Sequence, residues 1–106
     1  MSSLGYQMIY RWINDHPAAL AERFFCEFEP ALSVENQRAI ESFDVVAFSL
    51  SYELDFLETV RFLLQEGIGL RAAHRDPDTE PLVLAGGVGL LVNRLPIYDA
   101  ADILAL

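Results

Sequence analysis

The sequence of 106 residues predicts one α/β domain in which helices flank a parallel sheet. Two uninterrupted apolar runs, 44–50 and 82–85, predict strands that are covered on both faces, as is typical of parallel sheets. Residues 56–66, between these runs, have the apolar spacing of a helix. A strand, a helix and a second strand in this order imply a right-handed crossover. We therefore expect residues 1–106 to form a single domain with a Rossmann-like sheet.

The first element is predicted to be a helix over residues 3–15. Ser2 or Ser3 can cap it, and Pro17 ends it, because proline disfavours helical geometry in the residue before it. Its polar residues share one side, and its broad apolar side is made of Tyr6, Met8, Ile9, Tyr10, Trp12 and Ile13.

The second segment, residues 22–28, alternates between apolar and partly charged positions, which predicts a strand near a sheet edge. Ser33 is placed to cap a short helix around 34–42. Residues 71–81 are predicted to form a charged surface loop, and 102–106 a last short strand.

The helix over 56–66 has the clearest signals at its ends. Asp55 and Glu58 are predicted to form a capping box, and Gly67 is placed to stop the helix. Phe62 falls among polar residues, so it is either an ordinary exposed apolar residue or a contact with a partner domain or subunit. The predicted buried stripe consists of Phe56, Leu57, Val60, Leu63 and Leu64.

The charge of the chain argues against nucleic-acid binding by this piece alone. The net charge is −9, and binding a phosphate backbone requires clustered cations. The seven cations are all arginines and are scattered along the chain at Arg11, Arg23, Arg38, Arg61, Arg71, Arg75 and Arg94.

The single cysteine, Cys26, excludes an internal disulfide and a site made of several cysteines. Its aromatic neighbours indicate a small buried hydrophobic residue. No segment resembles a signal peptide or reaches the length of a membrane span, so we expect a cytoplasmic location.

The first candidate site follows the strand at 44–50. Ligands of doubly wound sheets lie beyond the carboxyl ends of the strands, and Ser49, Ser51, Tyr52 and Glu53 occupy such a position. Their polar groups and the start of the next helix could receive an anion or a polar ligand edge. The alternative is that the hydroxyls satisfy local backbone groups.

The second candidate site is the glycine pair Gly86 and Gly87, after the strand at 82–85. Glycine allows a positive φ or a close approach of the backbone to a ligand, although a tight turn explains the pair equally well. The spacing is not that of a dinucleotide-binding fingerprint. His16 and His74 have no partners at metal-ligand spacing, and no nucleophile and base are paired, so an independent hydrolase or transferase ranks last.

Several blocks of the chain together resemble one known family, the cobalamin-binding-like N-terminal domain of radical SAM proteins. The most specific block is Phe48–Leu54, within a match that extends over nearly the whole chain. The matching residues are 3–7, 21–23, 43–54, 67–71 and 84–87, with Asn93, Pro96, Asp99 and Asp102. Val88 and the pair Arg94 and Leu95 depart from the family pattern.

The resemblance implies that a radical SAM barrel follows in the parent protein and binds S-adenosylmethionine and a 4Fe–4S cluster. The cluster motif C-x-x-x-C-x-x-C is absent from this chain. Cobalamin is a possible further ligand, although the corrinoid-binding histidine motif is also absent. We therefore expect a non-catalytic domain that helps to form the substrate or corrinoid side of an active site. The alternative is a stand-alone flavodoxin-like module that binds a ligand or another protein; the absence of lysine disfavours a receiver-type regulator.

The resemblance also implies an incomplete domain, without an opening strand before Met1 and without a G-D/E-G-E turn after Leu106. In a flavodoxin-like order of 2-1-3-4-5, the missing strand would lie between those at 22–28 and 44–50. We expect a homodimer or larger assembly in which sheet edges or the first helix are buried between chains. The alternative is that the two strands pair directly within one monomer.

Overall fold

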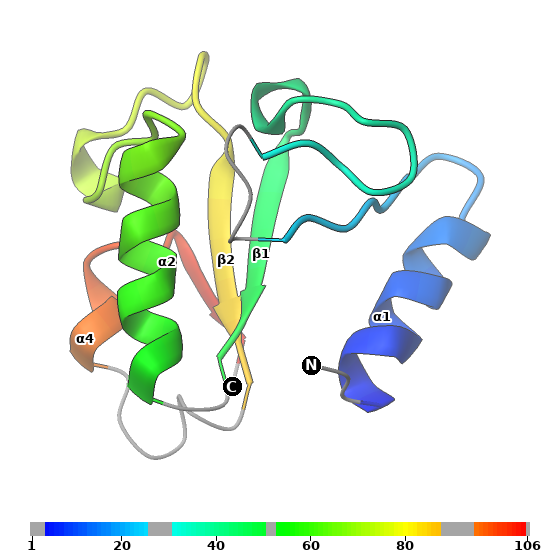
Figure 1. The fold of residues 1–106 in the computed structure, drawn as a ribbon, viewed down its shortest axis with the longest axis horizontal. Helices are drawn as coiled ribbons and strands as arrows, with labels where there is room; N and C mark the ends of the chain where they lie inside the picture. The colour runs from blue at the N-terminus through cyan, green and yellow to red at the C-terminus, as the bar shows by residue number, and fades with distance from the viewer. Residues whose placement is uncertain (1–3, 26–30, 51–52, 88–94, 106) are drawn as a thin grey trace.

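The protein is an α/β fold with a small parallel sheet, as the ribbon of the computed structural model shows (Figure 1). The structure describes residues 4–25, 31–50, 53–87 and 95–105. Of residues 4–6, 53–54 and 95–96 it describes the backbone only. The helices are α1 (Leu4–Asp15), α2 (Glu53–Gln65) and the short α4 (Leu95–Tyr98). The strands are β1 (Val45–Ser49), β2 (Leu82–Gly86) and β3 (Ile103–Ala105).

The three strands lie in the order β1-β2-β3, and both pairs are parallel. Val46 is opposite Val83, and Leu84 is opposite Ile103. The predictions of an α/β fold, of a parallel sheet and of strands at 44–50, 82–85 and 102–106 are confirmed. A finer assignment to a Rossmann-like or flavodoxin-like fold stays a prediction.

Helix α2 covers one face of the sheet and forms the core with it. One apolar cluster joins Phe62, Leu63 and Ile68 of this region to Val46 and Val83. A second cluster lies nearer the carboxyl ends of the strands and contains Leu50, Phe56, Ala85, Ile97, Ala100 and Ala101. Burial of these side chains is the main force that holds α2 against the sheet.

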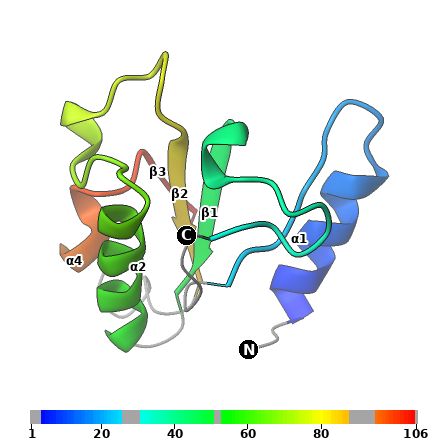
Figure 2. The same ribbon diagram turned by 45° about the horizontal axis from the view of Figure 1, so that its top comes forward.

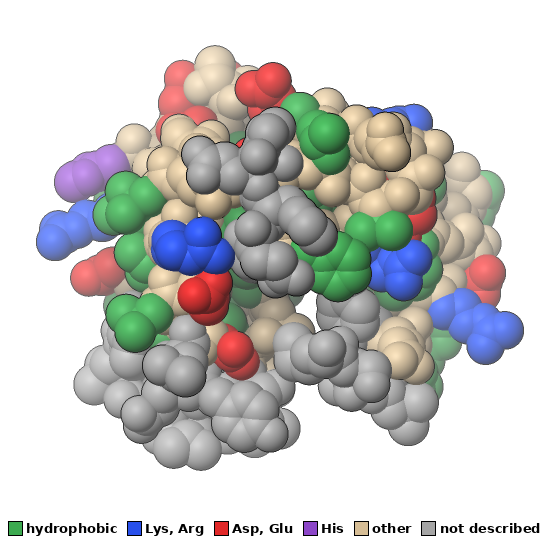
Figure 3. All heavy atoms as spheres, viewed as in Figure 1, with side chains coloured by type: hydrophobic (Ala, Val, Ile, Leu, Met, Phe, Trp, Pro, Cys, Tyr) green, Lys and Arg blue, Asp and Glu red, His purple; other side chains and the backbone are tan. Residues whose placement is uncertain are grey.

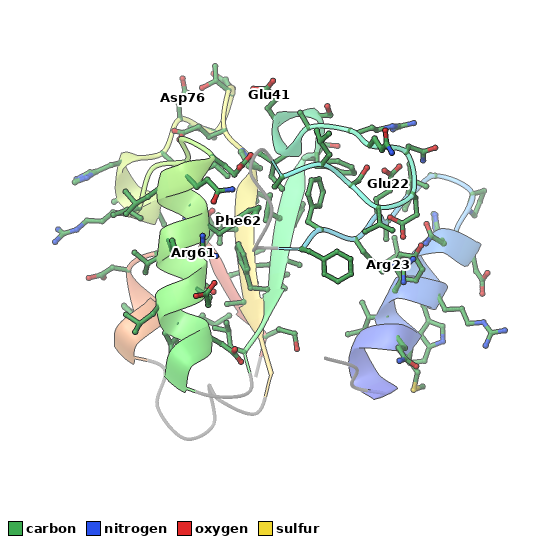
Figure 4. All side chains as sticks on the ribbon, viewed as in Figure 1. Glu22, Arg23, Glu41, Arg61, Phe62 and Asp76 are labelled. Atoms are coloured by element: carbon green, nitrogen blue, oxygen red, sulfur yellow. The ribbon has the colours of Figure 1, made fainter. Side chains whose placement is uncertain are left out.

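The buried side of α2 differs from the predicted stripe. Phe62 is 1% exposed, and its ring meets that of Phe48 edge-on with centroids 5.7 Å apart. Figure 4 shows Phe62 directed from α2 toward the sheet. Leu57 and Leu64, expected inside, are 67% and 61% exposed. The hypothesis that Phe62 contacts a partner is therefore wrong, because the larger ring fills the core.

The ends of α2 give one correction and one confirmation. The helix begins at Glu53, so Asp55 lies inside it and the predicted capping box is wrong. Gly67 does end it, with φ of +73°. The N–H of Ile68 donates to the Leu63 carbonyl, and that of Gly67 to the Leu64 carbonyl. These two bonds form a Schellman motif, which requires a left-handed residue at the glycine position.

The predicted strand at 22–28 is absent in the described residues 22–25, and 26–28 lie outside the described residues, as does Cys26. The backbone groups of Arg23 form hydrogen bonds outside the sheet. Its N–H donates to the Glu35 carboxylate, and its carbonyl accepts from the Val34 N–H. The direct pairing of this segment with β1, proposed as a way to close the sheet, is thus not formed by the described residues.

The predicted helix at 34–42 is not formed. Residues 33–38 form a turn that a backbone hydrogen bond between Ser33 and Arg38 closes, and a 3-10 turn follows at Ile40–Ser42. The N–H of Ser33 donates to the Arg38 carbonyl, and Gln37 has φ of +55°. The Ser33 hydroxyl, expected as a helix cap, accepts from the Arg38 N–H at 2.8 Å and donates to Glu22. Side-chain bonds of this kind compete with helix formation.

The loop at 71–81 includes a buried arginine that the prediction of a charged surface loop missed. The side chain of Arg75 is 3% exposed, although Arg71 beside it in the loop is exposed. Its guanidinium donates to the Gly69 and Ala100 carbonyls and to the Asp102 carboxylate. Since Asp102 also accepts from the Val83 N–H at 2.8 Å, the arginine ties the loop to the starts of β2 and β3.

Helix α1 is confirmed over Leu4–Asp15, and it lies to one side of the sheet, away from α2 (Figures 1 and 2). In the described part of the chain, no helix combines the length and the apolar character needed to cross a bilayer.

Candidate functional site at the carboxyl edge of the sheet

The structure brings the two candidate loops to one edge of the sheet. Because the strands are parallel, their carboxyl ends Ser49, Gly86 and Ala105 lie side by side in register. Helix α2 begins at Glu53, shortly after Ser49. Of the predicted site residues, Ser49, Gly86, Gly87 and the backbone of Glu53 therefore gather at the carboxyl edge, where α/β sheets bind ligands.

Gly87 is explained by contact with its own chain. Its φ is +112°, and a Cβ there would lie 2.4 Å from the Leu50 oxygen. The N–H of Leu50 donates to the Gly86 carbonyl at 2.7 Å. Gly86 is less constrained, since its Cβ would lie 3.5 Å from Ala105, an ordinary contact. The close approach of the backbone to Leu50 thus accounts for the second glycine without a ligand.

The apolar core reaches this edge of the sheet. Leu50 is 1% exposed and packs with Phe56, Ala85 and Ile97, directly beneath the ends of β1 and β2. Ser49 is half-buried at the rim. The described residues therefore place one hydroxyl and several backbone groups at this edge, next to the apolar core.

Part of the predicted site lies outside the described residues. Ser51 and Tyr52 belong to that part, as do Val88, Gly89 and Asn93. The side chain of Glu53 is also not described. The hypothesis that these polar groups receive a ligand stays a prediction.

A cavity of about 310 Å³ lies at the opposite edge, between the starts of β1 and β2. Glu41, at the upper end of the molecule in Figure 4, lines it together with Asp44, Asp78 and Glu80. The Gly69 and Asp76 N–H groups donate to the Glu80 carboxylate and hold its pKa below the ordinary value. Sequence reasoning missed this cavity, because its residues come from two charged loops far apart in the chain.

The two histidines are not at the carboxyl edge. His16 follows α1, and its Nδ1 accepts from the Ala18 N–H at 3.1 Å. His74 ends a 3-10 turn at Ala72–His74 in the loop that leads to the start of β2. Within the described ranges, no three His, Cys, Asp or Glu side chains are grouped so that they could hold a metal ion.

Comparison with known families gives one match. A family model for the N-terminal part of radical SAM proteins matches residues 5–106. The chain belongs to this family. Comparisons with curated proteins and with solved structures give no match. The radical SAM resemblance drawn from Phe48–Leu54 and the other blocks is confirmed at the level of the family, and its cobalamin-binding-like character stays a prediction.

Proposed function

We propose that this chain is a non-catalytic N-terminal domain of a radical SAM protein. Its carboxyl sheet edge would form the substrate or corrinoid side of an active site that a following radical SAM domain carries in the same polypeptide. The family match over residues 5–106 is the observation that supports this proposal most strongly. The proposal keeps the cobalamin-binding-like, Rossmann-like assignment of the fold and a cytoplasmic location.

The geometry of the carboxyl edge supports the second half of the proposal. Ser49, Gly86 and the beginning of α2 all lie at this edge. The cavity at the opposite edge is lined by several carboxylates, which favour contact with water. In this proposal the substrate binds at the carboxyl edge, next to the radical SAM domain.

The residues present do not fit the iron–sulfur cluster. A 4Fe–4S cluster is held by several cysteine thiolates, and the chain has a single cysteine, Cys26. The cluster and S-adenosylmethionine belong to the radical SAM domain of the parent protein in this proposal.

A corrinoid bound through histidine does not fit either. Neither His16 nor His74 lies at the carboxyl edge of the sheet. A corrinoid at this edge would have to be held without a histidine ligand.

The alternative function is a stand-alone module that binds a ligand or another protein. Exposed apolar side chains over α2, among them Leu57 and Leu64, suit such a contact (Figure 3). The family match favours the first proposal, because it describes an N-terminal part of a larger protein.

Photo-crosslinking in the parent protein tests which edge faces the radical SAM domain. A benzophenone amino acid is placed at Ser49 on the carboxyl edge or, as a matched control, at Thr79 beside the acidic cavity. We expect crosslinks from position 49, and none from position 79, to peptides of the radical SAM domain. Crosslinks from position 79 alone would contradict the proposal, and so would crosslinks from neither position.

A further inference from the structure

The sheet has a second face that no described helix covers. The register places Val45, Leu82 and Ile103 on the face opposite to Val46 and Val83, which pack on α2. These three side chains are 46%, 44% and 47% exposed. We call this surface the outer sheet face, and it consists of Val45, Ala47, Ser49, Leu82, Leu84, Gly86, Ile103 and Ala105. It contains no charged residue, so its exposure in water is unfavourable.

Helix α1 has an apolar side that is also without a partner in the described structure. Met8, Ile9, Trp12 and Ile13 are between 37% and 61% exposed, and together they are called the α1 apolar face. Neither of the two apolar clusters includes a residue of α1.

The side of α1 that carries Tyr10 and Asn14 is held by the loop that follows the helix. The Tyr10 hydroxyl donates to Glu35, and the guanidinium of Arg23 lies 5.1 Å from the centre of the Tyr10 ring. The Asn14 side chain exchanges hydrogen bonds with the backbone of Ala21. Helix α1 lies on the β1 side of the molecule (Figures 1 and 2).

We propose that a second copy of this chain covers both surfaces: the α1 apolar face of each copy packs on the outer sheet face of the other around a twofold axis. An amphipathic helix on an apolar sheet face is the ordinary layer arrangement of α/β proteins, and α2 already packs in this way on the inner face. A twofold exchange is self-complementary, so it leaves neither surface exposed in either copy. This inference does not depend on the proposed function.

The size of the surfaces fits a dimer of moderate affinity. In each copy, seven large apolar side chains that are now 37–61% exposed would be covered. This amounts to roughly 1,000 Å² over both copies, close to the lower limit of stable interfaces. The net charge of −9 per chain opposes association, so we expect the dimer to strengthen with added salt.

Trp12 reports directly on the contact, because it is the single tryptophan and is 61% exposed in the structure of one copy. Its emission is measured from nanomolar to high micromolar protein, in parallel with sedimentation equilibrium. We expect a shift to shorter wavelength that coincides with the monomer-to-dimer transition. A shifted emission that does not depend on concentration would show that α1 covers its own sheet, and a monomer with unshifted emission at all concentrations would also overturn the proposal.

Variants then separate the exchange from other modes of association. Ile9→Glu on α1 and Ile103→Glu on the outer sheet face are each expected to weaken dimerisation at least tenfold. The control Leu57→Glu changes a residue on α2 that is also exposed, at 67%, and it is expected to leave dimerisation unchanged. Circular dichroism checks folding, and Leu82→Glu replaces Ile103→Glu if the latter does not fold.

A mixture of the two variants tests the reciprocal exchange most directly. An equimolar mixture of I9E and I103E retains one intact helix-on-sheet contact, so it is expected to associate more tightly than either variant alone. No recovery in the mixture would contradict the reciprocal exchange and would indicate helix-to-helix or sheet-to-sheet association. A dimer that forms equally well in all the variants would also overturn the proposal.

Discussion

Two glycines with positive φ illustrate how the same residue type serves different physical needs. Gly67 has φ of +73°, and no atom lies within 4 Å of the place of a Cβ. Gly87 has φ of +112°, and a Cβ there would meet the backbone oxygen of Leu50 at 2.4 Å and its nitrogen at 2.8 Å. The first glycine meets a conformational requirement alone, whereas the second meets a conformational and a steric one.

Alanine at these two positions should therefore have unequal effects. Gly67→Ala is expected to lower the free energy of unfolding by about 1–2 kcal/mol, the cost of a left-handed alanine. Gly87→Ala is expected to cost about 3–5 kcal/mol, because backbone strain and overlap with Leu50 add. Urea denaturation of both variants measures the difference. Equal losses would show that the approach of Gly87 to Leu50 is not as close as described.

At single positions, the sequence predicts what depends on local geometry. The sequence predicts the end of the helix at Gly67 and the special backbone conformation at Gly87. A glycine directly after a helix or a buried strand usually marks a position with positive φ. The burial of Arg75 was not predictable in the same way. Its acceptors on Gly69, Ala100 and Asp102 come together only when β2 and β3 are in place.

At the level of elements, Glu35 connects α1 to the loop that follows it, because its carboxylate accepts hydrogen bonds from Tyr10 and Arg23. Burial raises the pKa of this carboxyl, but the Tyr10 hydroxyl and the N–H groups of Arg23 lower it more, to about 2. The same contact raises the pKa of Tyr10. Because the pKa in the folded state is below the ordinary value of 4.5, ionised Glu35 favours folding. This contribution is complete above pH 4.5 and is lost as the pH falls through about 2.

Glu35→Gln should then destabilise the protein in a pH-dependent way. At pH 7 we expect a loss of about 1–2 kcal/mol, since hydrogen bonds to a charged acceptor are replaced by weaker ones. The difference in the free energy of unfolding between the native protein and the variant should shrink as the pH approaches 2. Thermal unfolding across this range measures it. Glu58→Gln, which removes only the surface pair with Arg61, is the control and should cost less than about 0.5 kcal/mol. A pH-independent difference would contradict the assigned role of Glu35.

Elements with a strong pattern were predictable, and those decided by tertiary contacts were not. The runs at 44–50 and 82–85 became β1 and β2 because continuous apolar residues require cover. The register of burial on α2 was predicted incorrectly. Phe62 lies among polar residues in the sequence, but its ring packs against Phe48 of β1, whereas Leu64 is exposed. Residues 22–25 alternate like a strand, yet Glu35 and Val34 take the backbone groups of Arg23 that a sheet would use.

At the level of the whole molecule, the parallel sheet and the family match over residues 5–106 support the proposed N-terminal domain of a radical SAM protein. The location of the candidate site followed from the sequence, because parallel strands place their carboxyl ends together. Which groups contact a ligand did not follow, since Gly87 is explained by Leu50 and the acidic cavity near Glu80 lies at the other edge.

The central claim is that this chain is a non-catalytic part of a radical SAM protein, and anaerobic reconstitution tests it most directly. The chain and its parent protein are each treated with iron and sulfide, reduced, and given S-adenosylmethionine, and bound iron and 5′-deoxyadenosine are measured. We predict a cluster and 5′-deoxyadenosine from the parent protein and neither from the chain of 106 residues, because one cysteine cannot hold a cluster. A cluster on the chain that is lost in Cys26→Ala, together with 5′-deoxyadenosine, would contradict the account.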